Sequence, residues 1–151
     1  MLILADKEKK ILKQANAIFE KFSTYNAVEM TSPTLVINYL RGKIGFCDVE
    51  HFLVLYLNNQ NHLIESVIES TGTIDAASVY PRNIAKRALE LGACSVVLSH
   101  NHPSGICKPS QADRNITKKL QEGLRFLDIN VLDHVIVSGG DSYSFAEMGE
   151  M

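Results

Sequence analysis

Two histidines and one aspartate are spaced in this sequence as the ligands of a catalytic metal ion would be. His100 and His102 come at the end of an apolar run, and residues i and i+2 of a strand point to the same side. Asp113 falls in the first turn of a helix whose expected N-cap is Ser110, so the intervening loop can bring its carboxylate over the strand end. Two imidazoles and one carboxylate form a zinc set that leaves the fourth position for water.

Each part of this set also has a simpler interpretation. A His-x-His pair is more often structural or exposed than metal-bound, and Ser110-x-x-Asp113 alone is typical of a capping box. The two roles of Asp113 are compatible, because one carboxylate oxygen can bind metal while Ser110 caps the helix. Cys107 lies in the same loop and could close the site as a fourth ligand, although it has no paired thiol. The other histidines are expected to be structural or exposed; they are His51, His62 and His134.

The elements before this loop are predicted from hydrophobic periodicity. Apolar residues recur at helical spacing over residues 11–22, which predicts a first helix. Ser32 followed by Pro33 predicts a short second helix that ends near Leu40, with Gly42 and Gly45 as its breakers. Two apolar runs separated by a polar turn then predict a β-hairpin, with strands at 51–57 and 63–68.

The elements around and after the loop complete a mixed fold. A helix from Pro81 to the stop at Gly92 is expected to bury Ile84, Ala85, Ala88 and Leu89. The helix after Ser110 is expected to bury Ile116, Leu120 and Leu124, and further strands are expected at 94–98, 131–137 and 143–145. This order predicts an α/β or α+β domain in which helices pack on a mixed, mostly antiparallel sheet.

Length and composition indicate a single globular domain with little net charge. The chain has 151 residues, of which 46% are apolar and 21% charged, and its formal net charge is −2. These values exclude a disordered chain and argue against binding nucleic acid or anionic membrane through bulk charge. An odd number of cysteines without C-x-x-C spacing indicates a reducing compartment. With neither a signal peptide nor a membrane-length apolar stretch, the expected location is the cytoplasm.

The histidine loop resembles a known motif. His-x-His-Pro-x-Gly over residues 100–105, followed by Pro-Ser-x-x-Asp over 109–113, resembles the JAMM motif of the MPN/JAB metalloprotease superfamily, and the finer form His-Asn-His-Pro-Ser-Gly resembles its RadC branch. Residues 81–89, 132–137 and 144–147 also match, and the resemblance covers about residues 47–149. It implies a cytidine-deaminase-like fold, with residues 1–45 as a helical lead-in and residues 46–151 as the JAB/MPN domain.

The resemblance also implies roles for individual residues. The zinc ligands would be His100, His102 and Asp113, with Ser110 hydrogen-bonding the attacking water or the developing oxyanion. The superfamily needs an upstream glutamate as general base, and the matching position here is Glu50, directly before the strand at 51–57. The alternatives on the return strand, expected to be plain exposed carboxylates, are Glu65 and Glu69.

The function implied is zinc-dependent hydrolysis of a peptide or isopeptide bond in an unidentified protein or peptide substrate. One alternative is a non-catalytic interaction module, and another is a DNA-repair or recombination factor. Full-length RadC proteins carry an N-terminal helix-hairpin-helix-like element. Only about 45 residues precede the domain here, without a glycine-centred hairpin, so the chain resembles short single-domain members and direct nucleic-acid binding is not expected. The H-x-E and P-C-x-x-C signature of nucleobase deaminases is absent.

Overall fold

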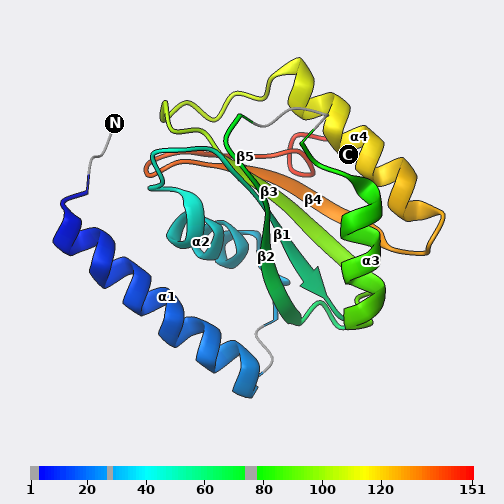
Figure 1. Cartoon of the computed structure of the whole chain (residues 1–151), viewed down its shortest axis with the longest axis horizontal. Coiled ribbons are helices and arrows are strands. Elements are labelled where there is room, and N and C mark those ends of the chain that lie inside the picture. Colours follow the sequence, from blue (N-terminus) through cyan, green and yellow to red (C-terminus); the bar gives the residue numbers. More distant parts are fainter. Residues whose placement is uncertain (1–3, 27–28, 74–77) are drawn as a thin grey trace.

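Four helices and five strands make up the described part of the chain (Figure 1). The structure is a computed structural model that describes residues 4–26, 29–73 and 78–151. The helices are α1 (Asp6–Asn26), α2 (Pro33–Ile44), α3 (Pro81–Leu91) and α4 (Gln111–Arg125). The strands are β1 (His51–Leu57), β2 (Leu63–Thr71), β3 (Ser95–Asn101), β4 (Asn130–Val137) and β5 (Ser142–Ser144). None of the helices in the described ranges is long and apolar enough to span a bilayer.

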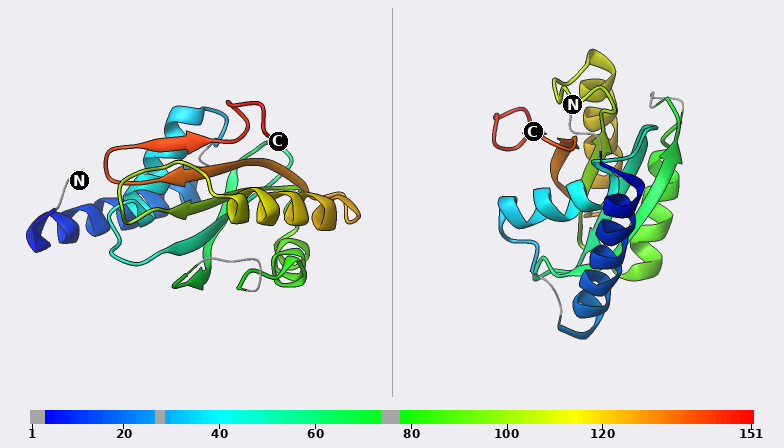
Figure 2. Two further views of the ribbon diagram at one scale, coloured as in Figure 1. Left: turned by 90° about the horizontal axis from the view of Figure 1, so that it is seen from above. Right: turned by 90° about the vertical axis from the view of Figure 1, so that its left-hand side faces the viewer.

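A five-stranded sheet forms the centre of the fold, with the strand order β2-β1-β3-β4-β5. The β3–β4 pair is parallel, and the other three pairs are antiparallel. Helix α2 covers one face of the sheet, while α3 and α4 cover the other (Figures 1 and 2). The predicted α+β class with a mixed, mostly antiparallel sheet is therefore confirmed.

The two faces of the sheet bury separate apolar clusters, because successive strand residues point to opposite sides. On the α2 side, Leu53, Leu55 and Leu57 of β1 pack with Leu40 and Ile44. On the side of α3 and α4, the cluster contains Phe52, Val54, Tyr56, Val96, Leu98, Ile84, Ile116, Leu120 and Leu124. The predicted inner face of α4 is confirmed, and the end of β3 is held between two helical layers.

Helix α2 is longer than its sequence indicates, and a glycine explains the difference. The expected end near Leu40 is wrong, since α2 runs through Gly42 to Ile44. A Cβ atom at Gly42 would lie 2.6 Å from Asn16 Oδ1 of α1, and the Asn16 amide donates to the Gly42 carbonyl. This glycine therefore permits the close approach of two helices instead of ending one.

Some apolar positions predicted to face inward are exposed. Leu89 of α3 is 60% exposed, although Ile84 and Ala88 of the same face are fully buried. In α1, Ile11 and Ile18 are 55% and 60% exposed, because α1 packs against α2 and does not lie on the sheet (Figure 1). The side chains of Phe19 and Phe22, expected on the same helix face, lie outside the described set.

Candidate metal centre

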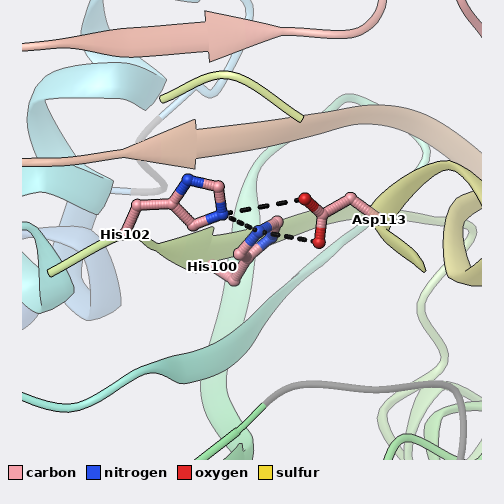
Figure 3. A group of neighbouring side chains, drawn as sticks. All are labelled: His100, His102 and Asp113. Carbon is pink, nitrogen blue, oxygen red and sulfur yellow. Dashed lines mark hydrogen bonds and ion pairs between the residues drawn. The ribbon is translucent and has the colours of Figure 1, made fainter. Parts of the chain in front are cut away.

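The end of β3 and the start of α4 bring three potential metal ligands to one point (Figure 3). His100 lies in β3, His102 follows the strand, and Asp113 lies in the first turn of α4. The two Nε2 atoms are 3.0 Å apart, while His100 Nε2 is 3.1 Å from Asp113 Oδ1 and His102 Nε2 is 3.7 Å from Asp113 Oδ2. Within the described residues, this is the group of His, Cys, Asp and Glu side chains that could hold a metal ion.

A capping box orients the aspartate within this group. The Asp113 N–H donates to Ser110 Oγ at 3.1 Å, and the Ser110 N–H donates to Asp113 Oδ2 at 2.7 Å. The other carboxylate oxygen, Oδ1, faces His100. The Asp113 side chain can therefore cap the helix and face the other potential ligands at once, because Oδ2 accepts from the Ser110 N–H while Oδ1 faces His100.

Electrostatics favour an ionised carboxylate at the centre of the group. Burial raises the pKa of Asp113, but the adjacent imidazoles of His100 and His102 outweigh it and hold that pKa well below its usual range. The pKa of His102 is raised, chiefly by its hydrogen bond with Asp113 and in smaller part by the charge of Glu50. A proton or another cation is thus stabilised between the imidazole and the carboxylate.

The donor set fits a divalent cation. His102 Nδ1 lies 2.8 Å from the carbonyl oxygen of Ile106. Since a carbonyl only accepts, Nδ1 carries the proton and Nε2 of the neutral ring presents a lone pair to the group. An imidazole lone pair therefore meets a carboxylate, and such a pair of acceptors is stable only around a proton or a metal ion. Imidazole nitrogen and carboxylate oxygen are both ordinary zinc ligands.

Glu50 lies beside this group at the start of β1. Phe52 of β1 is in register with His100 of β3 in an antiparallel pair, and continuing that register sets Glu50 opposite His102. Glu50 is half-buried, and its backbone carbonyl accepts a hydrogen bond from Gly72 N–H at 2.9 Å. The predicted general base is therefore near the predicted ligands, directly before the neighbouring strand β1.

An asparagine between the two histidines anchors the segment that carries Glu50. The Asn101 side chain accepts from His51 N–H at 2.7 Å and donates to the carbonyls of Val49 and Cys47 at 2.9 and 3.3 Å. Asn101 is 1% exposed, so these three bonds are shielded from water. The residues on both sides of Glu50 are thereby attached to the strand that carries the histidines.

The two alternative glutamates have other partners. Glu65 accepts a bidentate interaction from Arg87 at 2.9 and 2.8 Å, and Glu69 accepts from Tyr56 Oη at 2.6 Å. Both glutamates are half-buried and have side-chain partners, so the expectation of plain exposed carboxylates is wrong, while the choice of Glu50 as general base stays a prediction.

Cys107 is separate from the ligand group. Its side chain is buried in a small apolar cluster with Ile136 and Phe145. Burial raises the pKa of its thiol, which keeps the sulfur protonated and disfavours metal binding. The possibility of a fourth ligand from the loop is therefore not supported by the geometry.

The remaining histidines differ from one another. His51 Nδ1 lies 3.0 Å from Thr71 Oγ1, and His62 forms a 3.5 Å ion pair with Glu29. His134 is fully buried, and its Nε2 lies 2.8 Å from His100 Nδ1. Sequence reasoning missed this contact with a predicted ligand. The available signal was a polar Asp-His pair inside the apolar strand at 131–137.

Comparison with known proteins identifies the class to which this fold and site belong. Residues 30–150 match the family described as RadC-like JAB domain. The chain belongs to this family, as its sequence resemblance predicted.

Curated relatives of this chain are UPF0758 proteins of bacteria. One from Pseudoalteromonas translucida is 53% identical over 118 residues, which cover 78% of this chain and 53% of the relative. One from Vibrio vulnificus is 46% identical over 142 residues, which cover 90% of this chain and 63% of the relative. The chain therefore spans less than two thirds of the length of these relatives.

Proposed function

We propose that this domain is a zinc-dependent hydrolase of peptide or isopeptide bonds. The observation that carries the proposal is the convergence of His100, His102 and Asp113 at one point, with Glu50 directly before the adjacent strand β1. Membership in the RadC-like JAB domain family supports the same assignment. The substrate is a protein or peptide, since a net charge of −2 offers little attraction for nucleic acid.

The metal ion and the residues around it would have separate roles in the reaction. His100, His102 and Asp113 would hold a divalent cation, which would supply a water of lowered pKa, toward ~7, and a Lewis acid for the substrate carbonyl. Glu50 accepts the proton from the attacking water and passes it to the leaving amine. Ser110 uses its oxygen to cap α4, so its own O–H remains to donate to the developing oxyanion.

A cleft beside the histidines offers access for a substrate chain. Its volume is about 310 Å³, and it is lined by His102 and Pro103 together with residues 45–48 and 138–141. The cleft thus borders the exposed side of His102, whose ring points to the ligand group.

Metal analysis of the purified protein tests the first half of the proposal. We expect about one zinc ion per chain in the wild type and little in His100→Ala, while His62→Ala, which removes a histidine outside the group, keeps its zinc. A site of two histidines and one aspartate also accepts other divalent ions, so the elemental analysis should measure zinc and the other divalent metals in the same sample. Equal and negligible metal in the wild type and His100→Ala would contradict the metal site.

Hydrolysis of peptide and isopeptide libraries tests the second half. Wild type and Glu50→Gln are compared, with Glu122→Gln on the exposed face of α4 as a control that removes the same charge. Loss of a general base lowers the rate by about 10²- to 10⁴-fold, and the Glu122 variant should retain full activity. If the metal-loaded protein hydrolyses no substrate, or does so equally well without Glu50, the result would instead favour a non-catalytic interaction module.

A further inference from the structure

We propose that Thr117 and His134 are positioning residues that fix the tautomer of His100, so that its Nε2 lone pair faces the metal. The proposal rests on the metal site of the proposed function and extends it to residues that contact the ligand residues but are not metal ligands themselves. It assigns a role to the buried histidine of β4 and to a threonine in the second turn of α4.

A chain of short hydrogen bonds leads inward from His100. His100 Nδ1 lies 2.8 Å from His134 Nε2, and His134 Nδ1 lies 2.6 Å from Thr117 Oγ1. Thr117 Oγ1 lies 2.6 Å from the backbone carbonyl oxygen of Asp113. The exposed fractions of His100, His134 and Thr117 are 1%, 0% and 2%, so water does not compete for these bonds.

The end of this chain determines where each proton lies. A carbonyl oxygen only accepts, so the single hydroxyl proton of Thr117 is donated to Asp113 O. Thr117 Oγ1 must then accept from His134, which puts the His134 proton on Nδ1 and leaves Nε2 unprotonated. His134 Nε2 accepts in turn from His100, which puts the His100 proton on Nδ1. His100 Nε2 is left with a lone pair.

This is the one assignment of protons to neutral rings that satisfies all three contacts. If the Thr117 hydroxyl turned toward His134, two oxygen acceptors would face each other at 2.6 Å. The site therefore does not rely on the intrinsic preference of imidazole for one tautomer. Helix α4 supplies the ligand Asp113, and the backbone carbonyl of the same residue is the last acceptor in this series of hydrogen bonds.

Aromatic rings hold both imidazoles in plane for these bonds. Phe52 is stacked with His100, with ring centroids 6.3 Å apart and an interplanar angle of 10°. Phe145 is stacked with His134, with centroids 5.0 Å apart and an angle of 13°. A ring flip, which would put a ring carbon in the place of each nitrogen, would have to break these buried contacts as well as the hydrogen bonds.

Removing the hydroxyl should weaken metal binding without removing any ligand. In Thr117→Val the shape is kept, but His134 Nδ1 loses its acceptor, and its proton is no longer held on that atom. A proton on His134 Nε2 faces His100 Nδ1, which drives the His100 proton to Nε2, where the metal must bind. Loss of such an outer partner typically weakens metal affinity about ten- to hundred-fold. Thr117→Ser keeps the hydroxyl and should bind zinc as tightly as the wild type.

The test is a zinc titration against a competing chelator for wild type, Thr117→Ser and Thr117→Val, after urea unfolding has confirmed that each variant is folded. Wild type and Thr117→Ser should agree within about threefold, with Thr117→Val at least tenfold weaker. Equal affinity of Thr117→Val and wild type overturns the positioning role and leaves the metal site intact. A wild type that binds no zinc overturns the metal site and this inference together.

Nitrogen-15 NMR of the imidazole rings supplies a readout that needs no variant. In the wild type, loaded with zinc, we expect His134 to carry its proton on Nδ1 and to have an unprotonated Nε2. A proton on Nε2 of His134 would overturn the proposal, whatever the affinities of the variants. In a folded Thr117→Val protein the His134 pattern should change, which a purely structural role of Thr117 would not cause.

Discussion

Replacing Asn101 by aspartate should destabilise the protein in a pH-dependent manner. The variant has nearly the same shape and keeps the acceptor for His51 N–H at 2.7 Å, but it loses the N–H donors to the carbonyls of Val49 and Cys47. An oxygen then faces both carbonyls inside a site that is 1% exposed. The substitution therefore tests how strongly this side chain anchors the Glu50 segment.

The expected magnitude follows from these three contacts. A buried acceptor that loses its donor costs about 1–3 kcal/mol. Val49 is 50% exposed, so water can partly solvate its carbonyl, and the lower part of that range applies there. Adding the cost of a carboxylate without a cationic partner gives a loss of about 3 kcal/mol near pH 8. This is a large part of the ~5–15 kcal/mol by which domains are usually stable.

The sign of the pH dependence is fixed by the same geometry. Burial without a cation raises the pKa of the new carboxyl in the folded state above the ~3.9 of the unfolded chain. The variant is therefore closest to wild type below about pH 4, and its deficit grows as the pH rises toward the folded-state pKa.

Urea unfolding followed by circular dichroism at pH 5 and pH 8 provides the assay. Asn130→Asp, at an exposed position at the start of β4, makes the same change in net charge and should alter stability by less than about 0.5 kcal/mol. A deficit for Asn101→Asp that is equal at both pH values, or below about 1 kcal/mol at pH 8, would show that the three bonds do not anchor the segment as inferred.

Three further predictions concern stability in the zinc-free protein. Burial, together with the charge of His100, lowers the pKa of His134 well below its ordinary value. As the pH falls, this histidine is therefore protonated in the unfolded chain before it is protonated in the folded one. Stability should fall below about pH 6.5 by up to about 1.4 kcal/mol per pH unit, and urea unfolding of His134→Gln should lack this component. Ile116→Ala, at a 1% exposed core position, should cost about 2–5 kcal/mol, against less than about 0.5 kcal/mol for Ile106→Ala in the exposed loop; thermal melting distinguishes them. Ser110→Ala should cost about 1 kcal/mol through loss of the N-cap bond to Asp113, and Ser110→Asn should recover most of it; the same melts would refute the capping role if both variants matched wild type.

Features encoded by neighbouring residues were predictable from the sequence. The start of α4 follows from Ser110 and Asp113, whose side chains satisfy each other's backbone N–H groups. The approach of His100 and His102 follows from strand alternation, and the αL glycine that ends α3 follows from Gly92, whose φ is +65°. The choice of Glu50 depended on the family resemblance, because a strand-start glutamate has no local signature.

Features that depend on which strands become neighbours were not predictable in this way. The contact of His134 with His100 requires β4 to pair in parallel with β3, and strand order is set by packing of the whole chain. The exposure of Leu89 depends on how far α3 overhangs the sheet, and the continuation of α2 past Gly42 depends on the approach of Asn16. The boundary at residues 45–46 between a lead-in and the domain remains a prediction, although α2 packs on the sheet and the family match begins at residue 30.

The sequence distances among the site residues have a consequence for folding. All three ligand positions lie within residues 100–113, so a short loop closure is enough to bring them together. The segment at Glu50 reaches them only when β1 pairs with β3 over a separation of about 50 residues, which forms more slowly. We therefore expect the ligand set to assemble early and the proton acceptor to arrive late. For the proposed hydrolase, a partly folded chain that had already captured a cation would still be unable to hydrolyse its neighbours, and cleavage would begin only with the completed sheet.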